Sequence, residues 1–234
     1  MSVIAIVGNG PRLGFAIANV FGAQGYKVAL LSSDLGELQP LIAELAKHGT
    51  EAAGFSFNVL DRRLVASALT AVKERFGPID VLEFSAADAA LPLAAATALT
   101  PDKAQVWIDY YLRGANAAVN AVLPDMLARG SGTILFTTGV SSTYPELDHA
   151  AFAYFGLISA DLRNRARSLH TALASRGVQV GYVAIGAYLG RQSRATPEAI
   201  APLYWELHTH RDQFEKEFIP EAAEEASGLQ GDAA

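Results

Sequence analysis

The sequence predicts a doubly wound α/β fold, in which helices cover both faces of a parallel sheet. Short apolar runs alternate along the chain with segments of helical period, which are long enough to carry the chain back across a sheet. Several apolar runs are continuous rather than alternating, which is typical of strands buried on both faces. The strands predicted in this way are Val3–Val7, Lys27–Leu31, Ala52–Phe57, Asp80–Phe84, Thr133–Thr137 and Val178–Ile185.

Capping residues mark the starts of several predicted helices. Asp34 precedes Leu35-Gly36-Glu37, which is a pattern that permits a capping box. Thr100 and Thr196 each precede a proline and an acidic residue, so a capping hydroxyl comes before a proline in the first turn. No internal repeat, linker or domain boundary interrupts the series. The sequence therefore predicts one domain over residues 1–220 and a flexible acidic tail over residues 221–234.

The composition excludes several classes of protein. The 234 residues are 51% hydrophobic and 18% charged, which suits a globular protein with one sizeable core. The net charge is −6 and Lys and Arg do not cluster, so nucleic acid is not an expected partner. Because the chain has no cysteine, disulfides and thiolate catalysis are excluded, and no metal site is expected. The apolar run at the N-terminus is too short to cross a bilayer and lacks the basic flank of a secretion signal, which predicts a cytoplasmic protein.

A glycine-rich loop follows the first predicted strand and opens a helix. In this context glycines permit a tight turn and a close approach of the backbone to a pyrophosphate. The helix N-terminus then presents free N–H groups and a partial positive charge to the phosphates. The alternative is an ordinary glycine turn between a strand and a helix. The residues predicted to bind the dinucleotide here are Gly8, Asn9, Gly10, Arg12, Leu13 and Gly14.

From this loop onwards the chain resembles the short-chain dehydrogenase/reductase family. That family opens with a strand and a TGxxxGxG loop, and Gly8 and Gly14 match its first and last glycines. Val7 replaces the family Thr and Arg12 replaces the middle glycine. The guanidinium of Arg12 either obstructs a phosphate or clamps one.

Further segments follow the family in order. Residues 76–82 resemble its approach to the fourth strand, residues 123–126 its long dimer-forming helix, and residues 167–180 its last helix-to-strand passage. The resemblance implies a Rossmann fold of six strands in the order 3-2-1-4-5-6. It also implies a homodimer or homotetramer formed through helices near residues 101–129 and 150–175. The family usually closes with a seventh strand, whereas residues 196–218 are here predicted to form an amphipathic helix instead.

The resemblance assigns the remaining cofactor contacts to the ends of the second, third and fourth strands. Family members select NAD or NADP with residues at the end of the second strand, where this chain has Ser32 and Ser33. Two hydroxyls do not repel a phosphate and Arg12 lies nearby, which favours NADP over NAD. Asp34 follows one residue later, and the alternative is that Ser32, Ser33 and Asp34 only cap the next helix. The other predicted contacts are Asn58 and Val59, at the family adenine position, and Ser85 and Ala86, at its Asn-Ala-Gly turn.

The family's catalytic groups are replaced in this chain. In the family a Tyr exchanges the proton, a Lys four residues later lowers the pKa of that Tyr, and a Ser and an Asn assist. None of the eight tyrosines here has a lysine four residues later. The Tyr position falls on Phe152 when counted forward from the fifth strand, and on Phe155 when counted back from residues 167–169.

The other three positions are also changed. The Lys position is Gly156 or Ser159 according to the count, the Ser position is Gly139 and the Asn position is Tyr111. Substitutes lie nearby, although packing is the alternative role for each aromatic residue. The predicted catalytic residues are Tyr154, Thr138, Tyr111 and Tyr144, with Ser141, Ser142, His149 and a cation from Arg163 as further candidates.

Three functions are compatible with these residues. The first is an NAD(P)(H)-dependent oxidoreductase that acts on a small carbonyl or alcohol through a rewired proton donor. The second is a catalytically inactive dinucleotide-binding protein that serves as a sensor or scaffold. The third is a cofactor-free lyase or cyclase that reuses the pocket. The fold alone does not choose among them.

Overall fold

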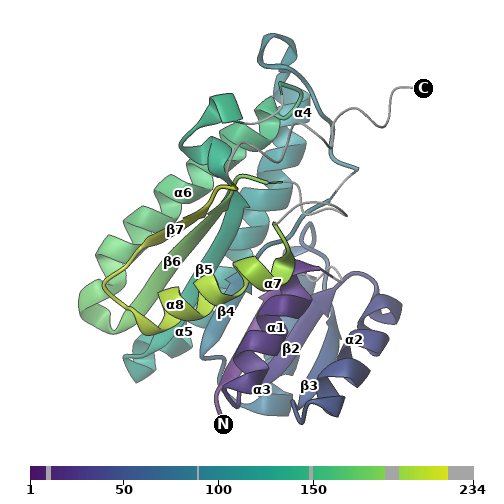
Figure 1. Ribbon diagram of the computed structural model, residues 1–234, viewed down its shortest axis with the longest axis vertical. Coiled ribbons are helices and arrows are strands. Elements are labelled where there is room, and N and C mark those ends of the chain that lie inside the picture. Colours follow the sequence, from purple (N-terminus) through teal and green to yellow (C-terminus); the bar gives the residue numbers. More distant parts are fainter. Residues whose placement is uncertain (9–11, 89, 148–149, 188–194, 221–234) are drawn as a thin grey trace.

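A seven-stranded parallel sheet forms the centre of the molecule (Figure 1). The computed structural model describes residues 1–8, 12–88, 90–147, 150–187 and 195–220. The strands lie in the order β3-β2-β1-β4-β5-β6-β7, and neighbouring strands of the described sheet pair in parallel. Their bounds are β1 Val3–Val7, β2 Lys27–Ser32, β3 Ala52–Ser56, β4 Val81–Phe84, β5 Gly132–Gly139, β6 Val178–Ile185 and β7 Glu215–Phe218. The predicted doubly wound fold and its first six strands are confirmed, with ends that differ by two residues at most.

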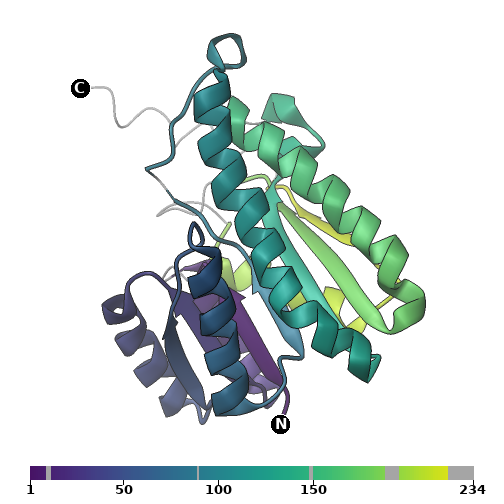
Figure 2. The ribbon, with the colours of Figure 1, turned by 180° about the vertical axis from the view of Figure 1, so that it is seen from behind.

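Helices cover both faces of the sheet. One face packs against α1 Leu13–Ala23, α2 Leu35–Lys47, α7 Pro197–Ile200 and α8 Pro202–Thr209, which lie in front in Figure 1. The other face packs against α3 Arg62–Phe76, α5 Gly114–Arg129 and α6 Ala153–Leu173, which Figure 2 shows from behind. Both faces of the central strands are therefore buried, which explains their continuous apolar sequence. Among the described helices, none combines the length and the apolar character needed to cross a bilayer.

The prediction of a single C-terminal helix in place of a seventh strand is wrong. The segment that starts at Pro197 forms two short helices, α7 and α8, and then β7, which pairs with β6 at the edge of the sheet. Pro202 begins the second helix, since proline suits a first turn. Strand β7 has four residues and the sequence Glu-Lys-Glu-Phe, so it lacks the apolar pattern by which strands were found. Short, charged strands are typical of sheet edges.

The predicted helix caps are confirmed at two of three positions. The Asp34 carboxylate accepts hydrogen bonds from the Gly36 and Glu37 backbone N–H groups at 2.7 and 3.4 Å. The Thr196 hydroxyl accepts one from Ala199 at 3.2 Å. At Thr100 the structure records no side-chain cap for α4 Pro101–Trp107; instead the Thr100 N–H donates to the Tyr154 hydroxyl at 2.6 Å. The predicted acidic tail lies outside the described residues.

The turn after β1 lies very close to the end of β4. Gly8 has φ +94°, and a Cβ built on it would lie 2.3 Å from the backbone N and Cα of Ala86. These two strands are neighbours, while the chain proceeds from β1 to β2 on the other side. Their carboxyl ends therefore form the point where the direction of winding reverses, which is where open α/β sheets bind ligands.

We predict that Gly8→Ala destabilises the protein far more than Gly25→Ala. Gly25 has φ +82° with no atom within 4 Å of a built Cβ, so its substitution costs only backbone strain, about 1–2 kcal/mol. Gly8→Ala carries the same strain and also forces the β1 turn away from β4, which we expect to cost roughly 2–3 kcal/mol more. Urea unfolding of both variants measures the difference. Equal losses of stability would contradict the close contact.

Candidate active site

Helix α1 begins at Leu13, after the turn that follows β1. Among the described residues no side chain caps this helix, and no acidic residue lies in its first turn. By contrast, α2 and α3 are capped by Asp34 and Asp61. Leu13 and Gly14 are buried, whereas Arg12 is exposed. An uncapped helix start at a winding reversal has the geometry and partial charge for a phosphate group.

Two predicted phosphate-binding residues, Asn9 and Gly10, lie outside the described residues. The contact of Gly8 with Ala86 and the start of α1 on either side of them are described, and both fit a loop that brings backbone close to a ligand. A side chain at position 8 would overlap the backbone of Ala86.

The end of β2 serves helix capping. The Ser32 hydroxyl accepts a hydrogen bond from the Asp34 backbone N–H at 3.1 Å, while the Asp34 carboxylate caps α2. The capping interpretation is therefore confirmed for Ser32 and Asp34. The Ser33 side chain is exposed at the same edge of the sheet. Binding of NADP by these residues stays a prediction.

The ends of β3 and β4 lie along the same edge. Asn58 is exposed, and its side-chain oxygen accepts a hydrogen bond from the Leu60 N–H at 3.0 Å. Val59 is buried against Gly114, where a built Cβ would lie 2.1 Å from Val59 Cγ2. Ser85 is half-buried and its N–H donates to the Val7 carbonyl at 2.9 Å. The structure thus brings the predicted contacts of four strands to one edge.

A buried carboxyl group lies directly below this edge. Glu83 in β4 has no exposed surface, and its two oxygens lie 2.8 Å from the Thr137 hydroxyl and 2.9 Å from the Ser85 hydroxyl. The Thr137 hydroxyl also lies 2.6 Å from the hydroxyl of Tyr204, a fully buried residue of α8. Burial raises the pKa of Glu83 to about 8, so the carboxyl is neutral at pH 7. Sequence reasoning missed Glu83, although one signal was available: a carboxyl group within the apolar run Val81–Phe84, buried on both faces of the sheet, needs polar partners.

Two predicted catalytic tyrosines lie in an aromatic cluster near α4. Tyr154 has no exposed surface, and its hydroxyl accepts the Thr100 N–H. Tyr111 stacks on Trp107 with ring centroids 5.5 Å apart, and burial raises its pKa. Tyr111 belongs to a π-helix, Ile108–Arg113, which separates α4 from α5 and which often accompanies functional sites. Packing explains both tyrosines without a catalytic role.

A third predicted tyrosine lies in the loop after β5. Tyr144 is half-buried and packs against the core on the α3–α5–α6 face. His149, its neighbour in the predicted pocket, lies outside the described residues. The catalytic role of Tyr144 stays a prediction.

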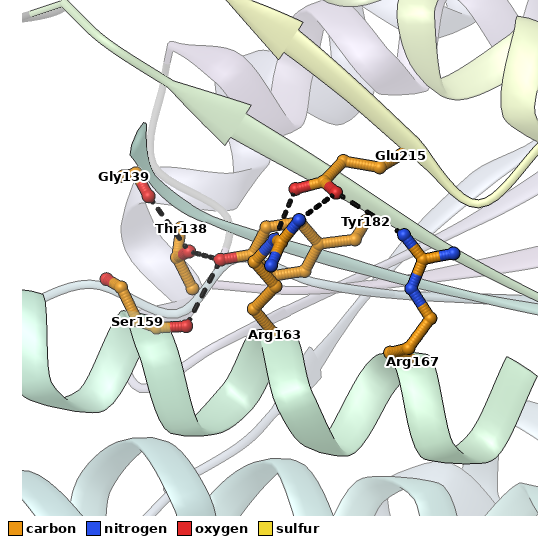
Figure 3. A network of polar contacts seen from close by, with 7 residues as sticks. All are labelled: Thr138, Gly139, Ser159, Arg163, Arg167, Tyr182 and Glu215. Carbon is orange, nitrogen blue, oxygen red and sulfur yellow. Dashed lines mark hydrogen bonds and ion pairs between the residues drawn. The ribbon is translucent and has the colours of Figure 1, made fainter. Parts of the chain in front are cut away.

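The end of β5 has an unpredicted partner in β6. The Tyr182 hydroxyl contacts the Thr138 hydroxyl and donates to the Ser159 carbonyl at 3.2 Å (Figure 3). Thr138 is 5% exposed, whereas Tyr182 and Ser159 are fully buried. Burial raises the pKa of Tyr182 to about 12. One signal was available in the sequence: an aromatic hydroxyl within a strand buried on both faces needs a polar partner.

Further hydroxyls and one phenyl ring surround Thr138. The Ser141 and Ser159 hydroxyls are buried, and neither has a hydrogen-bond partner among the described residues. A Cβ built on Gly139 would lie 2.5 Å from Phe155 Cε1 and 3.2 Å from Ser141 Oγ. Phe155 therefore faces the end of β5. This contact favours the count that places the family Tyr at Phe155 and the Lys at Ser159.

The candidate cation Arg163 is paired with β7. Its Nε and one terminal nitrogen lie 2.6 Å from the two carboxylate oxygens of Glu215, and Arg167 lies 3.8 Å from the same carboxylate (Figure 3). The Arg163 charge lowers the pKa of Tyr182 and the Glu215 charge raises it, while burial outweighs both. The Arg163 charge is therefore opposed by the Glu215 charge at the Tyr182 hydroxyl.

A groove lies between α5 and α6 on the outer face. Asn116 Oδ1 and Arg165 Nε are buried in its walls without a hydrogen-bond partner among the described residues. Assembly of copies through these helices stays a prediction, which the molar mass in solution tests.

Comparison with known proteins finds one family. A sequence model described as short chain dehydrogenase matches residues 2–198. An uncharacterised oxidoreductase of Staphylococcus saprophyticus is 29% identical over 192 residues, which are 79% of this chain and 77% of that protein. Several other curated relatives are longer, and the chain spans 65%, 48% and 64% of their lengths.

Solved structures share the fold. A metagenomic short-chain oxidoreductase in complex with NADP has a TM-score of 0.79 and 22% identity, over 93% of this chain and 95% of that one. An NADH-dependent reductase complexed with NAD has a TM-score of 0.81 and 19% identity, over 93% and 94%.

We predict that Glu83→Gln raises the free energy of unfolding at neutral pH. The folded-state pKa of about 8 exceeds the ordinary 4.5, so between these values the folded chain holds a proton that the unfolded chain releases. Wild-type stability therefore falls as pH rises through this window, by at most about 1.4 kcal/mol per pH unit. Glutamine cannot ionise, so the advantage of the variant grows from about pH 5 to about pH 8 and then levels off.

Urea unfolding across this range measures the effect. Glu206→Gln is the matched control, because Glu206 lies on α8 with its side chain 43% exposed, paired with Lys216. A stability difference for Glu83→Gln that does not change with pH would show that the carboxyl is ionised in the folded protein.

Proposed function

The chain belongs to the short-chain dehydrogenase family, and from that membership we propose that it binds a nicotinamide dinucleotide and reduces a small carbonyl compound. The observation that carries the proposal is the close approach of Gly8 to Ala86 beside an uncapped helix start. Such a cradle accepts a pyrophosphate against backbone N–H groups. When bound, the dinucleotide supplies or accepts the hydride, and the protein must supply the proton.

The remaining contacts would hold the two halves of the dinucleotide. Exposed Asn58 can hydrogen-bond to an adenine, and exposed Ser33 can donate to a ribose or to its phosphate. Ser33 and Arg12 carry no negative charge, and neutral or basic groups here suit the extra phosphate of NADP. We therefore propose NADP(H) as the preferred cofactor. Solved structures that share the fold include complexes with NADP and with NAD.

The proton would come from the hydroxyl pair at the end of β5. Thr138 is the more accessible member and would donate to the substrate oxygen, and the Tyr182 hydroxyl behind it would then turn its hydrogen from the Ser159 carbonyl to Thr138 to replace that proton. A Tyr182 pKa of about 12 leaves the phenol protonated at neutral pH. Such a group can protonate an alkoxide but rarely removes a proton from an alcohol, which favours reduction over oxidation. The unpartnered Ser141 and Ser159 hydroxyls suit a substrate oxygen in this space.

A second candidate is a dinucleotide-binding protein without catalysis. The contact between Phe155 and Gly139 supports this candidate, because a phenyl ring, which has no acidic proton to donate, lies beside the end of β5 next to Thr138. Turnover distinguishes it from the reductase, since both candidates bind the cofactor.

We predict that NADPH raises the melting temperature more than NADH does. A ligand at about 100 times its Kd adds about 2.7 kcal/mol to stability, or roughly 5–10 °C for a chain of this size. Nicotinamide alone is the control, because it lacks the pyrophosphate that the cradle would hold. No shift with either dinucleotide would remove both candidates and leave the cofactor-free lyase or cyclase.

We predict that Thr138→Val and Tyr182→Phe lower the rate of carbonyl-dependent NADPH oxidation by at least about 100-fold. Both changes preserve shape while removing a hydroxyl. Tyr154→Phe is the comparison, because the Tyr154 hydroxyl is engaged by the Thr100 backbone. Loss of turnover only in Tyr154→Phe would assign the proton to Tyr154, and no wild-type turnover with bound NADPH would favour the non-catalytic protein.

A further inference from the structure

The Glu83 carboxyl belongs to a hydrogen-bond network of four groups on the face of the sheet that α8 covers. The network runs from Tyr204 in α8 through Thr137 in β5 to Glu83, and from Glu83 to Ser85 at the end of β4. Glu83 and Tyr204 are fully buried and Ser85 is half-buried, so this hydrogen-bond network has one end in the core and the other at the edge of the sheet.

The protons of this network can be placed by counting donors. The Thr137 hydroxyl donates its one hydrogen to Glu83 Oε1 at 2.8 Å, so in its 2.6 Å contact with Tyr204 it accepts and the Tyr204 hydroxyl donates. The proton of a neutral Glu83 is therefore on the other oxygen, Oε2, which faces Ser85 at 2.9 Å.

The state of Glu83 decides what the Ser85 hydroxyl can do. A neutral Glu83 donates its proton to Ser85 Oγ, and the Ser85 hydrogen is then available to point away from the core. An ionised Glu83 has no proton to give and draws the Ser85 hydrogen inwards. Ser85 would then present only lone pairs to a ligand.

The outward side of Ser85 is the predicted dinucleotide site. The Ser85 N–H donates to the Val7 carbonyl, and a Cβ built on Gly8 would lie 2.6 Å from the Ser85 carbonyl carbon. Ribose hydroxyls and phosphate oxygens of a dinucleotide at this turn all accept hydrogen bonds. We propose that Glu83 is a positioning residue that, while neutral, makes Ser85 a hydrogen-bond donor to the bound dinucleotide, and that loss of the Glu83 proton weakens binding. This inference rests on the proposed function.

Few other ionisable groups face Glu83. Its partners in the neighbouring strands, Ile6 and Leu135, are apolar, as is the part of α1 that packs on this face. Tyr204 is the titratable group that approaches from α8, and burial raises its pKa well above the ordinary value. His208, one helical turn further along α8, contacts Tyr26 and Thr133 instead. Burial raises the pKa of Glu83 to about 8, so its ionisation can be followed where the protein remains folded.

The test is NADPH binding followed by fluorescence from about pH 7 to about pH 9.5, above the range in which a phosphate monoester titrates. Wild-type affinity is expected to fall about tenfold as pH rises, the loss of one good hydrogen bond. In Glu83→Gln the amide N–H donates to Ser85 at every pH, so the affinity should stay at the neutral-pH level throughout. Glu206→Gln, on the exposed side of α8, should follow the wild type.

A second variant, Ser85→Ala, separates the effect of the Ser85 hydroxyl on NADPH binding from the effect of the Glu83 charge. Ser85→Ala should bind NADPH about tenfold more weakly at neutral pH and show little further loss as pH rises. A Ser85→Ala profile as steep as the wild type, or a wild-type affinity independent of pH, would overturn the inference while leaving the proposed function intact. Absence of NADPH binding at every pH would instead overturn the proposed function, and the inference with it.

Discussion

The contact between the turn after β1 and the end of β4 is the constraint on which the site depends. Only glycine fits at position 8, because its φ is positive and the backbone of Ala86 occupies the space of a Cβ. This contact holds the turn after β1 against Ser85 and Ala86 at the point where the winding reverses. The proposed nucleotide site and the Glu83 carboxyl therefore both depend on the packing of Gly8 against the end of β4.

Strand β5 links the two polar networks of the sheet. Thr137 and Thr138 are consecutive, so their side chains project to opposite faces. Thr137 joins Glu83 and Tyr204 on the side of α8, and Thr138 joins Tyr182 and the Ser159 carbonyl on the side of α6. The end of β5 thus contributes Thr137 to the Glu83 network, which lies below the proposed dinucleotide site, and Thr138 to the Tyr182 network, which is the proposed proton donor.

The sequence predicted what depends on local patterns. Six strands were found because each is a continuous apolar run buried on both faces, and the Asp34 and Thr196 caps follow from neighbouring residues. Strand β7 was missed because it is short, charged and held by pairing with β6. Glu83 and Tyr182 were missed for a related reason: Thr137 is 54 residues from Glu83 and Thr138 is 44 residues from Tyr182, and only folding brings these pairs together. Phe155 and Phe152 could be separated only by the contact with Gly139.

Both networks also depend on the segment after residue 196. Tyr204 of α8 ends the first network, and Glu215 of β7 pairs with the arginine beside the second. The Arg163 charge lowers the pKa of Tyr182, but the Glu215 charge opposes it and burial outweighs both, so Arg163 does not bring this phenol towards neutrality as the family lysine does for its tyrosine. Burial acts in the opposite direction and keeps both Glu83 and Tyr182 protonated at pH 7. A site assembled from neutral, proton-bearing groups is better suited to giving protons than to taking them, and this physical bias, more than any single residue, argues for reduction as the direction of any chemistry here.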